Sequence, residues 1–152
     1  MVLIHLQEAT FIMKRLSALA AVLALVLVSS AFAGVQDFGA FTVDVPAGWT
    51  ATQDGETVGI VKNDNTASIS ITVDSTDGAS AKEIADAFVD ALKGKNLKQD
   101  GGAYTFTFDN GNSVNSEAIL TAEGGKYALF VVTGKENAPA EVSAIVNSLT
   151  EK

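Results

Sequence analysis

The 152-residue sequence lacks cysteine altogether, and it holds one histidine, His5, one arginine, Arg15, and only two prolines. Without cysteine the chain forms no disulfide and offers neither a thiolate nucleophile nor a thiolate metal ligand. Histidine is the side chain that most often moves protons near neutral pH and the commonest metal ligand. Because His5 and Arg15 both precede the main body of the sequence, the fate of the N-terminal segment decides which chemistry remains.

The most apolar segment of the chain begins just after a second methionine, Met13. A basic pair, Lys14 and Arg15, precedes residues 16–28, which are almost all Leu, Ala and Val, and the segment closes on a small-residue tail that ends in Ala-Phe-Ala. This three-part layout is typical of a secretory signal peptide. Thirteen residues of helix extend about 20 Å, less than the roughly 30 Å of a bilayer's hydrocarbon core.

We therefore predict a signal peptide over residues 13–33 that is cleaved between Ala33 and Gly34. Residues 1–12 precede a complete signal and are interpreted as an extension of the gene start. An uncleaved N-terminal anchor and a buried core helix are the alternatives. No cysteine follows the predicted cleavage site and no Arg-Arg pair precedes it, so neither lipoprotein processing nor twin-arginine export is indicated. The expected location is the periplasm or the exterior of the cell, with no membrane anchor after cleavage.

Cleavage would leave residues 34–152 as a single domain without His, Cys or Arg. Eight basic and seventeen acidic residues would then remain, for a net charge of about −9. Such a charge disfavours nucleic acids and anionic lipid surfaces as partners. The missing side chains exclude Ser-His and Cys-His catalysis, and they remove the usual ligands of zinc, copper and haem. We expect a non-enzymatic protein without a cofactor; the alternatives are a hydrolase that uses two carboxylates and a weak calcium-binding protein.

Alternating and continuous apolar patterns predict an antiparallel sheet of about six or seven strands. The segment 126–133 is apolar on both faces, which indicates a central strand covered on each side. Asn110-Gly111 predicts a two-residue hairpin turn, as does Gly124-Gly125. The remaining expected strands cover Phe41–Val45, Thr57–Lys62, Ser68–Asp74, Tyr104–Asp109 and Ser116–Ala122.

Two amphipathic helices are expected. Ser80 and Glu83 form a capping box at the start of the first helix, and Gly94 marks its end. The segment 93–102 is interpreted as a polar connection. A second helix begins near Pro139 and carries an apolar stripe. The predicted fold class is α+β, with one helix on each face of the sheet.

Three segments resemble PsbP-like domains and the small bacterial envelope proteins of the DcrB type. They are "FTVDVPAGW" after the predicted cleavage site, "GKYALFVVTG" late in the chain, and the terminal "EVSAIVNSL". The resemblance extends over most of residues 38–150. It implies an α/β/α sandwich around an antiparallel sheet and an accessory or binding role without catalysis, and it supplies no catalytic residue. The bacterial members are often lipoproteins, whereas this chain lacks the cysteine that would carry the lipid.

The candidate partner contacts are Phe38 and Trp49, two aromatic residues near the ends of the first expected strand. An exposed aromatic side chain there would anchor a protein or a small ligand of the cell envelope. The alternative for Trp49, the only tryptophan, is a structural role that closes one end of the core.

Several charged positions allow both a functional and a structural interpretation. Asp74, Asp77 and Gly78, like residues 109–113, are candidate calcium loops, although the ligand pattern of an EF-hand is absent and plain turns explain both. The remaining candidates are an acid–base pair, Asp86 and Asp90, on the first helix, and a basic cluster, Lys93, Lys95 and Lys98, that either docks an acidic partner or stabilises the helix end.

Overall fold

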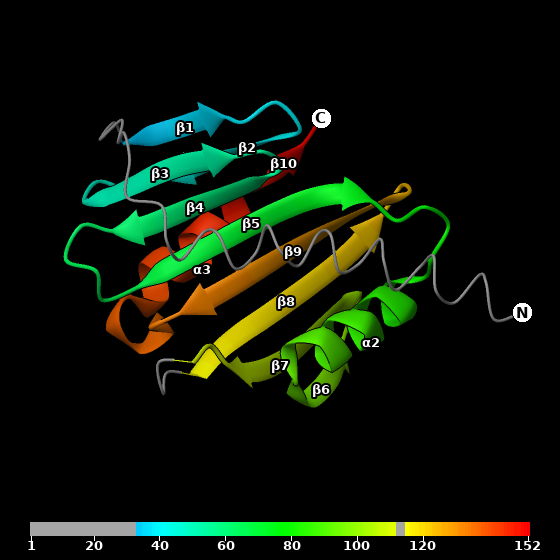
Figure 1. The fold of residues 1–152 in the computed structure, drawn as a ribbon. Helices are drawn as coiled ribbons and strands as arrows, with labels where there is room; N and C mark the ends of the chain where they lie inside the picture. The colour runs from blue at the N-terminus through cyan, green and yellow to red at the C-terminus, as the bar shows by residue number, and fades with distance from the viewer. Residues whose placement is uncertain (1–32, 112–114) are drawn as a thin grey trace, which may run out of the picture.

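A computed structural model describes residues 33–111 and 115–152, and it has the predicted α+β class. Seven antiparallel strands form the main sheet in the order β3-β4-β5-β9-β8-β7-β6, and β1, β2 and β10 form a second, three-stranded sheet. Figure 1 shows the main sheet as the middle of the molecule, with helix α2 on one face and helix α3 on the other. Residues 13–32 of the predicted signal peptide lie outside the described residues.

The main sheet consists of two meanders that meet at one strand. The first meander ends at β5 and the second begins at β6, and the chain crosses between them through α2. Strand β9 follows the second meander and inserts between β5 and β8, antiparallel to both. The strands are β3 (Trp49–Asp54), β4 (Thr57–Lys62), β5 (Ser68–Ser75), β6 (Lys95–Asp100), β7 (Ala103–Asp109), β8 (Asn115–Glu123) and β9 (Lys126–Thr133).

Strand β9 contributes to two separate cores, which confirms the prediction from its two apolar faces. Phe130 and Val132 pack with β4, β5 and α3, whereas Tyr127 and Leu129 pack with β7, β8 and α2. Because successive side chains point to opposite faces of a sheet, one strand can serve both cores. The predicted arrangement of one helix on each face is therefore correct.

Helix α2 spans Ala81–Leu92 and begins as predicted. The Ser80 side chain accepts a hydrogen bond from the Glu83 N–H, and the Glu83 carboxylate accepts one from the Ser80 N–H at 2.8 Å. The helix ends differently from the prediction, because Lys93, and not Gly94, adopts the left-handed conformation. Gly94 is required by packing instead: a Cβ atom there would lie 2.7 Å from the ring of Phe106.

Helix α3 (Pro139–Ser148) begins at the predicted proline and follows a short 3₁₀ helix, η1 (Lys135–Asn137). It shares its layer with the three-stranded sheet, which consists of β1 (Gly34–Asp37), β2 (Phe41–Val45) and β10 (Thr150–Glu151). The apolar face of β2 packs into the same core as α3. The backbone N–H of Asp44 donates to the Ser148 hydroxyl at 2.9 Å, so β2 and the end of α3 are directly joined.

Two expectations about the second meander are wrong. The segment interpreted as a polar connection contains strand β6, which pairs with β7 at the edge of the main sheet. The Asn110-Gly111 turn is not a two-residue hairpin, because Asp109 pairs with Asn115 and five residues separate them. The Asp109 carboxylate accepts the Gly111 N–H at 2.8 Å, which forms a local turn within this longer loop. The Gly124-Gly125 hairpin is confirmed by the pairing of Glu123 with Lys126.

Within residues 33–111 and 115–152, neither helix has the length and the apolar character that a membrane crossing requires.

Candidate functional site

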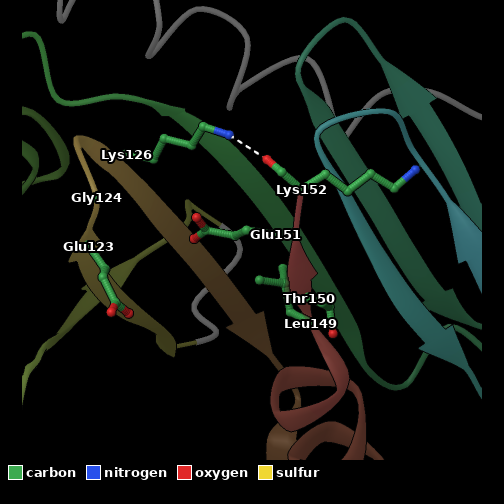
Figure 2. A pocket seen from close by; sticks show the side chains of 7 residues that line it. All are labelled: Glu123, Gly124, Lys126, Leu149, Thr150, Glu151 and Lys152. Atoms are coloured by element: carbon green, nitrogen blue, oxygen red, sulfur yellow. Dashed lines mark hydrogen bonds between the residues drawn. The ribbon is translucent and has the colours of Figure 1, made fainter.

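A pocket of about 540 Å³ lies between the β8–β9 turn and the last residues of the chain. Glu123, Gly124 and Lys126 line one side of it, and residues 149–152 line the other (Figure 2). These two segments are far apart in the sequence, and they meet here because β10 pairs with β2 beside the main sheet. The sequence does not predict this pocket, because no local pattern connects its two sides.

The pocket combines two carboxylates with a fixed ammonium group. Lys126 Nζ donates to the main-chain oxygen of Lys152 at 2.8 Å, and this contact ties the end of the chain to β9. Glu123 and Glu151 belong to the opposite sides of the same pocket, as Figure 2 shows, and both are exposed. Carboxylates so placed can attract a cation or an amine, but the open setting gives them similar environments.

An ion pair joins Lys152, one of the residues that line the pocket, to strand β1. Lys152 Nζ contacts the Asp37 carboxylate at 2.5 Å. The hydrogen bond from Lys152, together with one from the Gly39 N–H, lowers the pKa of Asp37 from its ordinary value. The Lys152 N–H also donates to the Ala40 oxygen at 3.1 Å, so β10 is anchored at several atoms.

The two predicted aromatic contacts lie at the end of the core beside β2. Trp49 is 2% exposed, and its indole N–H donates to the Glu141 carboxylate of α3. This position agrees with the structural interpretation of Trp49. Phe38 is half-buried and packs its ring against Phe41, with 5.7 Å between the ring centroids. A partner contact through either residue is not tested by this structure and stays a prediction.

The predicted cleavage site precedes the folded strands. Gly34 opens β1 and pairs with Val45 of β2, and Ala33 stands immediately before it. A cut between Ala33 and Gly34 would leave every described strand complete. The cleavage itself stays a prediction.

The first candidate calcium loop is a hydrogen-bonded turn at the end of β5. Ser75 occupies its centre, where its N–H donates to Asp74 at 2.7 Å and its hydroxyl contacts the Asp77 carboxylate at 2.7 Å. Across the described parts of the chain, no group of three or more acidic side chains is arranged to hold a metal ion. The second candidate loop, residues 109–113, includes residues 112 and 113, which lie outside the described residues. Weak calcium binding stays a prediction.

The two members of the candidate acid–base pair on α2 differ in exposure, because Asp86 is half-buried and Asp90 is exposed. The Asp86 carboxylate accepts a hydrogen bond from Lys82 Nζ at 2.6 Å, one helical turn earlier. An ion pair with Lys82 gives Asp86 a structural role on the helix surface, and neither carboxylate lines the pocket described above.

The predicted basic cluster lies where α2 passes into β6, at the outer edge of the main sheet. Lys93, Lys95 and Lys98 are all exposed. The sequence indicates these residues but not the strand that carries two of them, because a polar edge strand lacks an apolar repeat.

The fold is shared with solved structures of low sequence identity. Cyanobacterial PsbP (CyanoP) from Synechocystis sp. PCC 6803 aligns with a TM-score of 0.52 at 14% identity, over 85% of this chain and 99% of that protein. A protein from Bacteroides thetaiotaomicron VPI-5482 aligns with a TM-score of 0.56 at 15% identity, over 80% of this chain. This chain spans only 49% of the Bacteroides protein. No model of a known protein family and no curated protein matches the sequence. The domain therefore has a PsbP-like fold.

Proposed function

We propose that this protein is an exported, non-enzymatic accessory domain that binds a partner in the cell envelope. The observation that carries the proposal is the PsbP-like fold combined with the absence of His, Cys and Arg from residues 34–152. A domain without these residues lacks the common means of proton transfer, nucleophilic attack and bidentate anion binding. A binding role without catalysis is therefore the function that suits this domain best.

Export is the second part of the proposal. It is supported by the basic, apolar and small-residue zones of residues 13–33, and by a strand that begins directly at Gly34. Cleavage before Gly34 would therefore leave no additional residues in front of the first strand. The further assignment to DcrB-type envelope proteins rests on the sequence resemblance alone.

Two measurements in the native cell test the proposal. Mass spectrometry of the protein after cell fractionation should find Gly34 as the N-terminus in the periplasmic or extracellular fraction. Chemical crosslinking in intact cells should then join the domain to a specific envelope protein, and the reciprocal capture should recover the domain. An intact N-terminus in the cytosolic fraction would refute export, and failure of reciprocal capture would refute stable partner binding.

A carboxylate hydrolase is the second candidate, and the pocket is the observation that favours it. Glu123 and Glu151 line the same pocket, as an acid and a base that flank a glycosidic bond would. Glycosidases place such groups in contrasting environments, so that one donates a proton and the other does not, whereas Glu123 and Glu151 are both exposed; the shared pocket alone favours this candidate. Incubation of the domain with envelope glycans, beside the double variant E123Q/E151Q, tests this candidate. Product release by the native protein alone would support the hydrolase over the accessory role.

A further inference from the structure

The lysines of the described residues divide into two groups. Five of the eight have an oxygen partner for their ammonium group: Lys62, Lys82, Lys126, Lys135 and Lys152. The other three are Lys93, Lys95 and Lys98, and their ammonium groups have no such partner within the described parts of the chain. We call these three residues the lysine edge, since Lys95 and Lys98 lie on the outermost strand of the main sheet and Lys93 lies two residues before it, at the end of α2.

A β-bulge places two of these lysines on the same side of β6. Lys95 pairs with Thr107 and Lys98 pairs with Thr105, so three steps along β6 match only two along β7. In a regular strand, residues three apart point to opposite faces. The extra residue removes this alternation, and Asn96 supplies the left-handed conformation that the bulge requires, with φ of 59°. Lys95 and Lys98 consequently point to the face that carries Thr105 and Thr107.

The bulge also sets the spacing of the two lysines. Lys95 and Lys98 pair with Thr107 and Thr105, which are two residues apart on β7. The Cα atoms of the two lysines therefore lie about 6.6 Å apart along the strand direction, which is the spacing of alternate residues in an extended chain. An added strand with carboxylates at alternate positions would therefore meet both ammonium groups. A strand whose carboxylates are spaced differently would meet only one of them.

Packing fixes the base of the lysine edge. Gly94 lies against the ring of Phe106 with no space for a side chain. This close packing fixes the connection between α2 and β6. The Asn96 side-chain amide donates to the Thr107 hydroxyl at 3.3 Å, and this contact supports the bulge from the neighbouring strand. The lysines therefore project from a defined backbone and not from a free loop.

The outer side of β6 has no neighbouring strand among the described residues. An edge of this kind offers main-chain N–H and C=O groups to an extended segment, which is the basis of binding by strand addition. Lysines and bulges normally protect such edges, because a neutral or basic strand gains no partner for the ammonium charges. The same lysines favour an acidic strand, so the edge would discriminate between added strands by their charge.

We propose that the lysine edge binds an acidic, extended segment of a partner protein, whose alternate carboxylates contact Lys95 and Lys98. The inference rests on the proposed accessory function, since it assigns the partner a place and a chemistry. An anionic membrane is a poorer match, because apart from these three lysines the described residues carry seventeen acidic and five basic side chains. Nearby acidic residues, Asp90 on α2 and Asp100 at the end of β6, limit the positive surface to a narrow strip along the strand.

Two peptides of equal composition test the spacing argument with the mature protein. In the first, Glu and Thr alternate; in the second, Glu-Glu and Thr-Thr pairs alternate, so that no two Glu residues are two positions apart. The alternating peptide should bind about fivefold more tightly, since each exposed ion pair contributes roughly a twofold to fivefold gain. Its binding should weaken with added salt and should shift the amide resonances of residues 95–100.

The variant K95Q/K98Q should bind the alternating peptide about tenfold more weakly than the native protein. The control K82Q/K135Q removes the same charge from two other exposed lysines and should bind normally. Deletion of Asn96 keeps every charge but removes the bulge, so it should abolish the preference for the alternating peptide; an amide spectrum shows whether the variant remains folded.

Several results would overturn the inference. They are the absence of peptide binding, equal affinity for the two peptides, equal loss in the lysine-edge and control variants, and binding to vesicles of anionic lipid without binding to the peptide. The accessory function survives these results if reciprocal capture in cells still recovers a partner with K95Q/K98Q. Failure of capture with the native protein, in contrast, would refute the proposed function itself.

Discussion

Replacement of Trp49 by Ala is expected to be among the most damaging single changes to this domain. The side chain is 2% exposed, and it packs in the core formed by β2, the first meander and α3. Removal of a buried aromatic ring of this size costs about 3–5 kcal/mol, which includes the cavity that remains. The Glu141 carboxylate would also lose the indole N–H as a partner.

This loss is large against the whole stability of a small domain, about 5–15 kcal/mol. With a urea m-value of about 1–3 kcal/mol/M, the midpoint of unfolding should fall by roughly 2 M. Far-UV circular dichroism is the suitable assay, because the variant lacks the tryptophan that fluorescence would report. Trp49→Phe is the matched control: it keeps an aromatic ring in the core and loses the indole N–H.

The outcome separates the two interpretations of Trp49. A core residue predicts a large loss for Trp49→Ala and a smaller loss for Trp49→Phe. A surface anchor predicts almost no change in the urea midpoint with a clear loss of partner capture. A decrease of less than about 1 kcal/mol in the free energy of unfolding would refute the core assignment, because surface substitutions lie in that range.

Three further predictions concern local structure. Gly134→Ala should strongly destabilise the domain by urea titration, because the new Cβ would lie 2.1 Å from the Thr66 oxygen at a φ of 70°. Ser80→Ala should cost about 1 kcal/mol, since it removes the side-chain half of the capping box with Glu83, while Ser80→Asp should restore most of it. Hydrogen bonds from the Lys62 ammonium and then from Thr66 lower the pKa of Asp64, so its contribution to stability should be complete above the unfolded pKa, near 3.9, and should be lost as the pH falls through the lower folded value. Thr66→Val should raise the Asp64 pKa in an NMR titration, and an unchanged titration would contradict this account.

The sequence predicted the parts of the fold whose signals are local. The two-faced apolar pattern of residues 126–133 identified the central strand, and the Ser80–Glu83 box located the start of α2. Strand β6 was missed because its outer position and its bulge remove the alternation that identifies a strand. The small sheet was missed because β10 has only two residues and depends on its pairing with β2.

The candidate sites were less predictable for a related reason. The pocket joins the β8–β9 turn to the last residues of the chain, a meeting that only tertiary structure determines. The three lysines were visible as a basic cluster, but their common direction depends on the register of β6 against β7. At Asn110-Gly111 the local signal was overridden, since Asn110 donates its side-chain amide to Ser116 at 3.2 Å within a wider loop.

The central position of β9 has a consequence for how the domain folds. Until residues 126–133 have been synthesised, no strand joins the first meander to the second. Each of the two hydrophobic cores then lacks the side chains that β9 contributes to it. Contacts between residues distant in the sequence form slowly, because the connecting chain must first lose its freedom. A nascent chain of this protein should therefore remain unfolded until β9 has been synthesised, and then the two halves should join in one cooperative step. Late closure of this kind leaves the polypeptide unfolded for most of its synthesis.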